Sequence, residues 1–363
     1  MLLASQPGAH LASVASAFPR TRVDREAATI ALTSLFPHEP ADFVANLVER
    51  CGVETRYIVP SLSEVLEPSS FTARNERYRD AATELSLRAC RTALERARLA
   101  ATDVDVIVDV SCTGVVIPAL DVSLAPALGL RADVRRIPIT ESGCAAGALA
   151  LGLAATLAQC GQRVLIVAVE LCSLTLVRGD ASRTNLVASV LFGDGAAAAV
   201  VVPNGTGPRV EAVGSHLIPD TQATMGFHVG DHGLRILLQR ELPSVLIEHL
   251  PGAQRRFLAE HGRSIDDVGL HLIHPGGRRV LEAYSAMNAL APDALRYSRE
   301  SLRRYGNLSS ASILTVLELA LEDGATVPAG RSAFVMGIGP GLSLEMLLLR
   351  WPDAHDGGAG VAV

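Results

Sequence analysis

Hydrophobic runs of strand length recur along the chain, each followed by polar or glycine-rich residues. Asp103-Val-Asp-Val-Ile-Val-Asp-Val leads into the loop Ser111-Cys-Thr-Gly, and the runs that begin at Arg163 and Ala196 are similarly apolar. Short apolar runs rich in β-branched side chains and bounded by turn residues are typical of strands buried on both faces. We therefore expect buried strands flanked by helices.

Longer segments with helical periodicity separate these runs. Residues 40–60 and 74–100 are predicted as helices with Arg and Glu on their exposed faces. The stretch from Cys144 to Cys160 is rich in Ala and Gly, and it is shorter than the roughly 20 residues that a membrane-spanning helix needs. It is predicted as a buried helix, and no integral membrane association is expected. Residues 213–240 are predicted as excursions and short strands outside the core.

The order of elements repeats in the second part of the chain. Ser264-Ile-Asp-Asp-Val-Gly-Leu-His-Leu-Ile follows a charged helix and ends in the glycine-rich Pro275-Gly-Gly, and the run that begins at Arg331 matches the earlier one at Arg163. We predict an α/β fold built from two similar halves. The halves are expected to span residues 1–210 and 211–363.

Composition narrows the classes of function. The 363 residues are 49% hydrophobic and 19% charged, which is sufficient for a large buried core. The net charge of −6 lacks the basic excess with which proteins bind polyanions, so nucleic acid is not expected as a partner. All 32 basic residues are Arg. The absence of Lys excludes Schiff-base lysines, P-loop lysines and Ser-Lys dyads.

The six cysteines are spread along the chain without a C-x-x-C pair. This pattern favours free thiols in a reducing, cytoplasmic setting. The first residues show no basic segment followed by an apolar one, so no secretory signal is expected. His271 and His274 have opposite parity on one predicted strand and cannot chelate the same metal, so no metal site is expected.

Cys144 is the strongest candidate for a reactive residue. It lies in Glu141-Ser-Gly-Cys-Ala-Ala-Gly, where a strand-like segment turns into the Ala-rich helix. The amides and dipole at a helix N terminus lower the pKa of a thiol, and the small neighbours leave room for a substrate. A packed core cysteine is the alternative interpretation, because free Cys is among the most buried residue types.

Two further residues have side chains that could assist a thiol. His274 ends a predicted strand and precedes Pro275-Gly-Gly, so its ring is expected at the rim of the sheet. Asn307 precedes an apolar helix, where an Asn is commonly just an N-cap. A thiolate, an imidazole that holds it as an ion pair, and an amide donor for a developing enolate together suit acyl transfer from a thioester. The glycine-rich loop at Gly337 lacks the spacing of a dinucleotide site.

Six motifs, in order along the chain, carry a resemblance to a known family. They run from residue 110 to residue 341: Val110-Ser-Cys-Thr-Gly-Val-Val-Ile-Pro, Gly143-Cys-Ala-Ala-Gly, Leu191-Phe-Gly-Asp-Gly-Ala-Ala-Ala, His274-Pro-Gly-Gly, Tyr305-Gly-Asn-Leu-Ser-Ser and Gly337-Ile-Gly-Pro-Gly. With these motifs the chain resembles the type III polyketide synthases, the chalcone-synthase-like branch of the thiolase superfamily, over roughly residues 40–350. The resemblance implies a five-layered αβαβα fold and a homodimer. It also implies iterative condensation of malonyl-CoA onto an acyl-CoA starter, with CoA thioesters as substrates and no metal or redox cofactor.

The resemblance also implies roles for individual residues. Cys144 would be the acylated nucleophile, His274 would hold its thiolate, and His274 with Asn307 would stabilise the enolate formed on decarboxylation. Positions that match the substrate site are Phe192 as gatekeeper, Ile117 reaching into the neighbouring subunit, Ser309 beside the Asn, and Cys112, Cys172, Thr175, Gly276 and Gly277 as further lining. Arg50 and Arg56 fall near the basic CoA-phosphate contacts of the family, although a solvated helix face is the alternative interpretation.

Two departures bear on the substrate. Ile236 and Ile338 stand where relatives commonly carry Phe, so two aromatic rings are replaced by aliphatic side chains. A cavity with aliphatic walls favours a medium or long fatty acyl starter and an alkylpyrone or alkylresorcinol product. Other segments resemble the bacterial tetrahydroxynaphthalene synthases, which start from malonyl-CoA. A single-step ketoacyl synthase and an inactive acyl-CoA-binding scaffold are the remaining alternatives.

Overall fold

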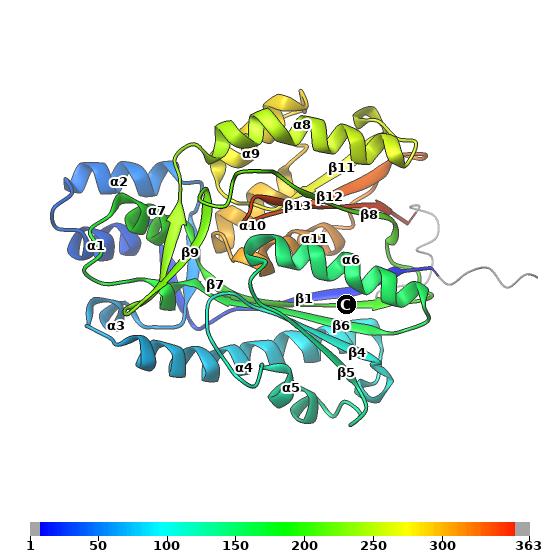
Figure 1. Ribbon diagram of the computed structural model, residues 1–363, viewed down its shortest axis with the longest axis horizontal. Helices are drawn as coiled ribbons and strands as arrows, with labels where there is room; N and C mark the ends of the chain where they lie inside the picture. The colour runs from blue at the N-terminus through cyan, green and yellow to red at the C-terminus, as the bar shows by residue number, and fades with distance from the viewer. Residues whose placement is uncertain (1–7, 353–363) are drawn as a thin grey trace, which may run out of the picture.

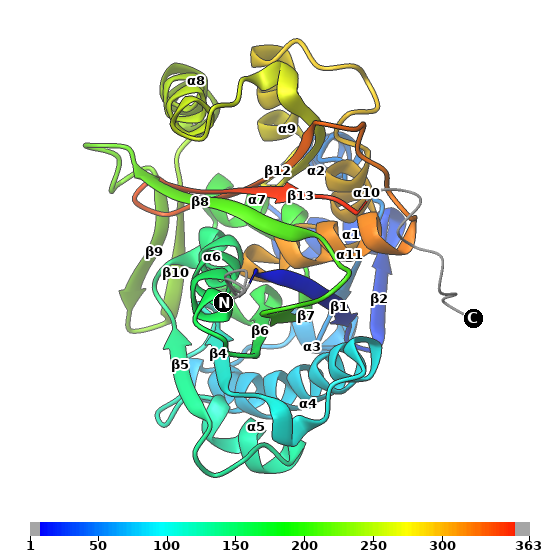
Figure 2. The ribbon, with the colours of Figure 1, turned by 90° about the vertical axis from the view of Figure 1, so that its right-hand side faces the viewer.

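Helices and half-sheets alternate in five layers in the computed structural model, which describes residues 8–352 (Figures 1 and 2). The nine strands of the main sheet lie in the order β11-β12-β13-β8-β1-β7-β6-β4-β5. Their bounds are β1 (His10–Ala17), β4 (Val106–Val110), β5 (Arg135–Ile139), β6 (Val164–Leu171), β7 (Asp194–Val202), β8 (Arg209–Leu217), β11 (Val268–Ile273), β12 (Ser332–Gly339) and β13 (Ser343–Arg350). Residues 1–7, on which the expectation about a secretory signal rests, lie outside the described range.

The main sheet consists of two half-sheets that meet only at one corner. β1 and β8 pair through a single residue pair, His10 and Arg209, while every other neighbouring pair of strands shares a longer register. The chain passes from one half-sheet to the other between β7 and β8. The boundary that we predict at residue 210 falls just inside β8 and stays a prediction.

Helices cover both outer faces and fill the space between the half-sheets (Figure 2). The middle layer holds α6 (Ala146–Gln159) and α11 (Ser312–Glu322), and their apolar side chains form one core with strands of both half-sheets. One outer layer contains α4 (Phe71–Ala97) and α5 (Asp121–Leu128). The other contains α8 (Leu242–Glu260), α9 (Arg278–Met287) and α10 (Arg296–Tyr305). Within residues 8–352, no helix has the length and apolar character of a membrane span.

A cap of smaller elements closes one end of the layers (Figure 1). It comprises α1 (Arg25–Leu35), α2 (Ala41–Arg50), α3 (Leu62–Leu66), α7 (Arg183–Leu191), the ribbon of β2 (Thr21–Asp24) with β3 (Thr55–Ile58), and the hairpin of β9 (Met225–Gly230) with β10 (Gly233–Leu238). Short 3-10 turns complete the list: η1 (Ala101–Asp103), η2 (Gly143–Ala145), η3 (Cys172–Thr175), η4 (Ile265–Asp267) and η5 (Ser309–Ala311).

Two of the predicted elements differ from the structure. The helix predicted over residues 40–60 ends at Arg50, and β3 follows it, because Gly52 adopts a positive φ of 90° that breaks the helix. Residues 213–217 belong to β8 in the main sheet rather than to an excursion. The side chains of β8 alternate between buried and exposed, so its apolar signal is weaker than that of strands buried on both faces.

Gly147 tests how tightly the middle layer is packed. A Cβ at this position of α6 would overlap the backbone carbonyl oxygen of Ser310, whereas a Cβ at Gly152 on the same helix would lie 3.6 Å from Val213. We expect Gly147→Ala to lower the free energy of unfolding by about 1–3 kcal/mol through overpacking. Gly152→Ala should be neutral or stabilising by up to about 1 kcal/mol. Urea midpoints measure both, and equal midpoints for the two variants would contradict this account of the packing.

Candidate active site

Cys144 lies in η2, immediately before α6, and is buried. Its Sγ is 3.3 Å from the hydroxyl oxygen of Ser309. Burial raises the pKa of Cys144 to about 12, opposed only in part by the hydrogen bonds to Ser309 and to a backbone amide. The lowering of the pKa that we expect from the helix N terminus is therefore outweighed by desolvation.

Asn307 approaches the same place from the other half of the chain. It lies between α10 and η5, and its Oδ1 accepts a hydrogen bond from the backbone N–H of Ser309 at 2.8 Å. Ser309 thus contacts both Cys144 and Asn307. Because Oδ1 serves as the acceptor, Nδ2 is the group of this amide that can donate to a substrate.

The backbone of Asn307 is fixed by the segment that carries Phe192. The Asn307 N–H donates to Leu191 O at 2.9 Å, and the Gly193 N–H donates to Asn307 O at 3.0 Å, which forms a parallel bridge between Asn307 and Phe192. A Cβ at Gly193 would overlap the carbonyl oxygen of Tyr305. The backbones of Phe192 and Asn307 are therefore held together by this bridge, and the bridge requires glycine at position 193.

His274 directly follows β11 and is 2% exposed. The backbone N–H of His274 donates to the carbonyl oxygen of Met336 on β12 at 2.8 Å. Gly337, which follows Met336 on β12, packs against Ala145 of η2. Within residues 8–352, Nδ1 of the imidazole has no hydrogen-bond partner. Burial lowers the pKa of His274 to about 4, so desolvation favours the neutral ring. The structure links His274 to the Cys144 turn through β12.

A cavity of about 810 Å³ opens beside Cys144. Nine of the residues predicted for the site line it: Cys112, Ile117, Cys144, Cys172, Thr175, Phe192, Ile236, Ser309 and Arg56. The remaining predicted residues, His274, Asn307, Gly276, Gly277, Ile338 and Arg50, are not among its lining. The cavity is also lined by aliphatic side chains of α1 and α3, among them Leu32, Leu35, Leu62 and Val65.

Ile236 and Ile338 occupy different surroundings. Ile236 lines the cavity from β10, and Phe227, its cross-strand partner on β9, lines the cavity too. Ile338 is buried in the outer core with Phe334 and Leu342, because alternate residues of β12 face opposite sides and its neighbours Gly337 and Gly339 face Ala145. An aromatic ring therefore remains in the wall, and Ile338 does not shape the cavity directly.

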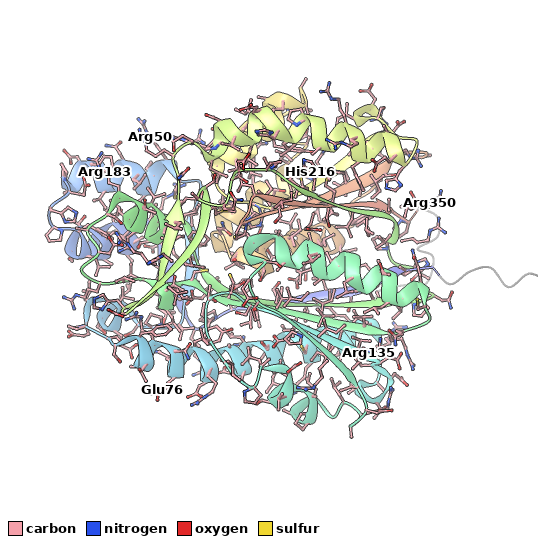
Figure 3. The ribbon with its side chains drawn as sticks, viewed as in Figure 1. Arg50, Glu76, Arg135, Arg183, His216 and Arg350 are labelled. Atoms are coloured by element: carbon pink, nitrogen blue, oxygen red, sulfur yellow. The ribbon has the colours of Figure 1, made fainter. Side chains whose placement is uncertain are left out.

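The two arginines predicted to contact the phosphates of CoA, Arg50 and Arg56, differ in their exposure to solvent. Arg50 is exposed at the end of α2, where its side chain points outward (Figure 3). Arg56 is buried and donates to the carbonyl oxygens of Ser189 at 2.7 Å and Phe192 at 3.4 Å. The Arg56 guanidinium thus fixes the backbone of the gatekeeper segment in this structure, and its predicted contact with phosphate stays a prediction.

Glu170 is a buried acid that the sequence reasoning missed. At the end of β6 it accepts hydrogen bonds from Thr113 Oγ1 at 2.7 Å, Ser310 Oγ at 2.5 Å and Cys112 N at 3.1 Å. Burial raises its pKa. The available signal is a single Glu that ends an otherwise apolar run, Val164-Leu-Ile-Val-Ala-Val-Glu. Through these hydrogen bonds Glu170 connects the loop that carries Cys112 to η5, and so it stabilises the position of Ser309 in η5.

Comparisons with known proteins agree with this architecture. Residues 45–208 match the family model described as chalcone and stilbene synthases, N-terminal domain, and residues 210–351 match the corresponding C-terminal domain. A 1,3,6,8-tetrahydroxynaphthalene synthase of Streptomyces peucetius subsp. caesius is 38% identical over 95% of this chain and 93% of its own. A protein of the same description from Streptomyces coelicolor is 38% identical over 87% of this chain and 85% of its own.

A solved structure confirms the predicted fold class. The crystal structure of the Streptomyces coelicolor tetrahydroxynaphthalene synthase, a bacterial type III polyketide synthase, has a TM-score of 0.90 and 35% sequence identity, and the match covers 95% of this chain and 100% of that one. The thiolase-like αβαβα arrangement expected from the sequence is thus present. With both family models matching and these relatives covering nearly its whole length, the chain belongs to the chalcone and stilbene synthase family and is an acyl-transferring type III polyketide synthase.

Proposed function

We propose that this enzyme condenses malonyl-CoA units onto an acyl group carried by Cys144. The Cys144 sulfur attacks the thioester carbonyl of the starter, and the CoA thiol leaves with the proton. Malonyl-CoA then loses CO₂, and His274 with Asn307 donates to the enolate oxygen that forms. The enolate carbon attacks the acyl carbon and releases the Cys144 thiolate. The observation that carries this proposal is that Ser309 contacts both Cys144 and Asn307 at the floor of the cavity.

The shape of the cavity supports an apolar starter. Part of its wall is formed by aliphatic residues of α1 and α3, including Ala28, Leu32 and Leu62. Burial of each methylene there would contribute about 0.8 kcal/mol to binding. A medium or long fatty acyl-CoA is therefore the proposed starter, and cyclisation of the extended chain would give an alkylpyrone or alkylresorcinol.

A second candidate is synthesis of 1,3,6,8-tetrahydroxynaphthalene from malonyl-CoA alone. The two relatives described above carry that name. The cavity near Cys144 is also polar, because Thr113, Thr175 and Ser309 line it, which suits a chain of ketone groups. Product analysis with malonyl-CoA alone and with a ladder of acyl-CoAs distinguishes the candidates. Alkylated products support the first, and a tetrahydroxynaphthalene formed without added starter supports the second.

The enzyme is proposed to act as a homodimer. Ile117 is 93% exposed and Val115 is 50% exposed at the mouth of the cavity, although both are apolar. β5 forms one edge of the main sheet. An exposed apolar side chain at a cavity mouth fits insertion into a second subunit. CoA thioesters are the proposed substrates, without a metal or redox cofactor. The six free cysteines support a reducing, cytoplasmic location.

Replacement of the nucleophile separates the two half-reactions. Cys144→Ala should lower polyketide formation by more than about 1,000-fold, because the acyl group has no attachment point. Malonyl-CoA decarboxylation should remain measurable, because His274 and Asn307 are still present. Radiolabelled malonyl-CoA reports both products. Cys160→Ala, which removes an exposed cysteine, is the matched control. Wild-type condensation by Cys144→Ala would refute the assignment.

The role of His274 appears in the pH dependence of alkylation. Burial is the largest of the causes that raise the pKa of Cys144 to about 12, so a thiolate at pH 7 requires a neighbouring cation. With His274 present, the rate of iodoacetamide alkylation should level off near neutral pH. In His274→Ala it should fall at least tenfold at pH 7 and keep rising above pH 9, since each pKa unit changes the thiolate fraction about tenfold.

The matched control for this experiment is His271→Phe. His271 lies on β11, three residues before His274, but hydrogen-bonds to Tyr284 at 3.0 Å, so its loss should leave the profile unchanged. If wild type and His274→Ala had the same pH profile, the proposed ion pair would be wrong.

A larger side chain at position 236 should make the enzyme prefer a shorter acyl-CoA starter. Ile236→Phe adds a ring to the wall of the cavity, and we expect kcat/KM for long relative to short acyl-CoAs to fall by about tenfold or more. Ile247→Phe on the exposed side of α8 is the control, because Ile247 lies outside the cavity lining. Competition between two acyl-CoAs in one reaction measures the ratio. Unchanged selectivity in Ile236→Phe would contradict the proposed location of the acyl chain.

A further inference from the structure

One face of α4 contacts two walls of the cavity without lining it. After the N-cap Ser70, the helix carries Phe71, Arg74, Asn75 and Tyr78, and the spacing i, i+3, i+4, i+7 places them on one side. We call these four residues the clamp face. None of them is among the residues that line the cavity. Glu76 lies between them in sequence and points away from the molecule (Figure 3).

The first two clamp residues hold the β9–β10 hairpin and η3. Arg74 donates to His232 O in the hairpin turn at 2.6 Å, to Leu174 O in η3 at 3.0 Å and to Ser69 O at 2.5 Å. The Phe71 ring lies against Gly233, where a Cβ would be 2.5 Å from the ring. Gly233 has a positive φ of 104°, so it suits this close approach.

The other two clamp residues hold the loop from Ser111 to Ile117. The side chain of Asn75 donates to Val115 O at 2.7 Å and accepts from Val115 N at 2.8 Å. The Tyr78 hydroxyl donates to Ser111 Oγ at 2.6 Å, and its ring covers Gly114, which has no side chain to obstruct it. This loop carries Cys112 and Ile117, both of which line the cavity.

The hairpin depends on such anchors for its position. β9 and β10 hydrogen-bond only to each other among the described strands, and an isolated two-stranded hairpin is marginally stable. It nevertheless supplies much of one wall: Met225, Gly226, Phe227, Val229, Leu234, Ile236, Leu237 and Leu238. A second anchor is the ion pair between Arg235 and Asp180 at 3.0 Å. Arg74 is the anchor at the turn.

We propose that the clamp face is a specificity-determining positioning element, which sets the separation between the hairpin and the Ser111–Ile117 loop. This separation decides the length of acyl or polyketide chain that the cavity holds. The proposal rests on the proposed function, because chain length has meaning only for an iterative condensing enzyme. The four residues act through the walls they hold, and the reacting groups are Cys144, His274 and Asn307.

Two variants without hydrogen-bond donors test the proposal. Arg74→Met keeps an unbranched apolar stem but loses the guanidinium, and Asn75→Leu keeps the shape without the paired bonds to Val115. We expect kcat/KM for long relative to short acyl-CoA starters to shift by about tenfold or more and the products to spread over more chain lengths. With malonyl-CoA alone, the spread in the number of extensions is the readout. Cys144 alkylation should stay within twofold of wild type.

The control and the rescue separate positioning from general stability. Arg88→Met removes a similar arginine–carbonyl bond of α4, to Phe18 O at 3.2 Å, and Phe18 is not a lining residue. It should leave the product distribution unchanged. Arg74→Lys should restore part of the selectivity, since an ammonium can donate to a carbonyl but lacks the planar fork.

Hydrogen exchange provides a readout that does not need turnover. Amides of residues 225–238 should exchange faster in Arg74→Met, and those of residues 111–117 faster in Asn75→Leu, each variant loosening its own wall. Unchanged exchange with unchanged product lengths, or the same changes in Arg88→Met, would overturn the proposal. If the wild-type enzyme made no polyketide from any CoA thioester, the proposed function would be wrong. The hydrogen-exchange measurement alone would then show whether the clamp face holds the hairpin and the Ser111–Ile117 loop.

Discussion

Close approach of backbone segments around Cys144 is the constraint on which the site depends. A Cβ at Gly339 would lie 2.5 Å from the Cβ of Ala145, and one at Gly143 would lie 2.6 Å from the ring of Pro340. Gly147 and Gly193 permit equally close contacts with Ser310 and Tyr305. Glycines at these points let the ends of β12, α6 and α10 meet. The nucleophile is thereby buried at a junction to which both halves of the chain contribute.

Burial at this junction sets the electrostatics. Desolvation raises the pKa values of Cys144 and Glu170 and lowers that of His274, so burial by itself favours the neutral form of each group. In such a low-dielectric site, donors aimed at a developing enolate are more effective than they would be in water. A thiolate there needs a compensating cation, which is why the imidazole is central to the proposed chemistry. Nδ1 of the buried His274 ring has no hydrogen-bond partner among the described residues.

Continuous apolar runs predicted the α/β class and the strands that are buried on both faces, and the resemblance to a known family implied the five layers. The sequence did not predict β1, which pairs with β7 and touches β8 of the other half-sheet. The small residues of β1 alternate with apolar ones and give only a weak strand signal. Positions of the motifs indicated Cys144, Ser309 and Asn307, which the structure brings together. The different surroundings of Ile236 and Ile338 could not be predicted, since they depend on which face of a strand meets the cavity. Arg56 is a similar case, because only the fold reveals that its guanidinium is buried.

Peptide mapping by mass spectrometry after brief exposure to an acyl-CoA tests the central claim most directly. The account predicts a single acyl adduct on the peptide that contains Cys144. Cys112 and Cys172, which share the cavity but whose pKa values are raised well above the ordinary range by burial, should remain unmodified. An adduct on either of those cysteines in place of Cys144, or no adduct with any acyl-CoA, would contradict the account.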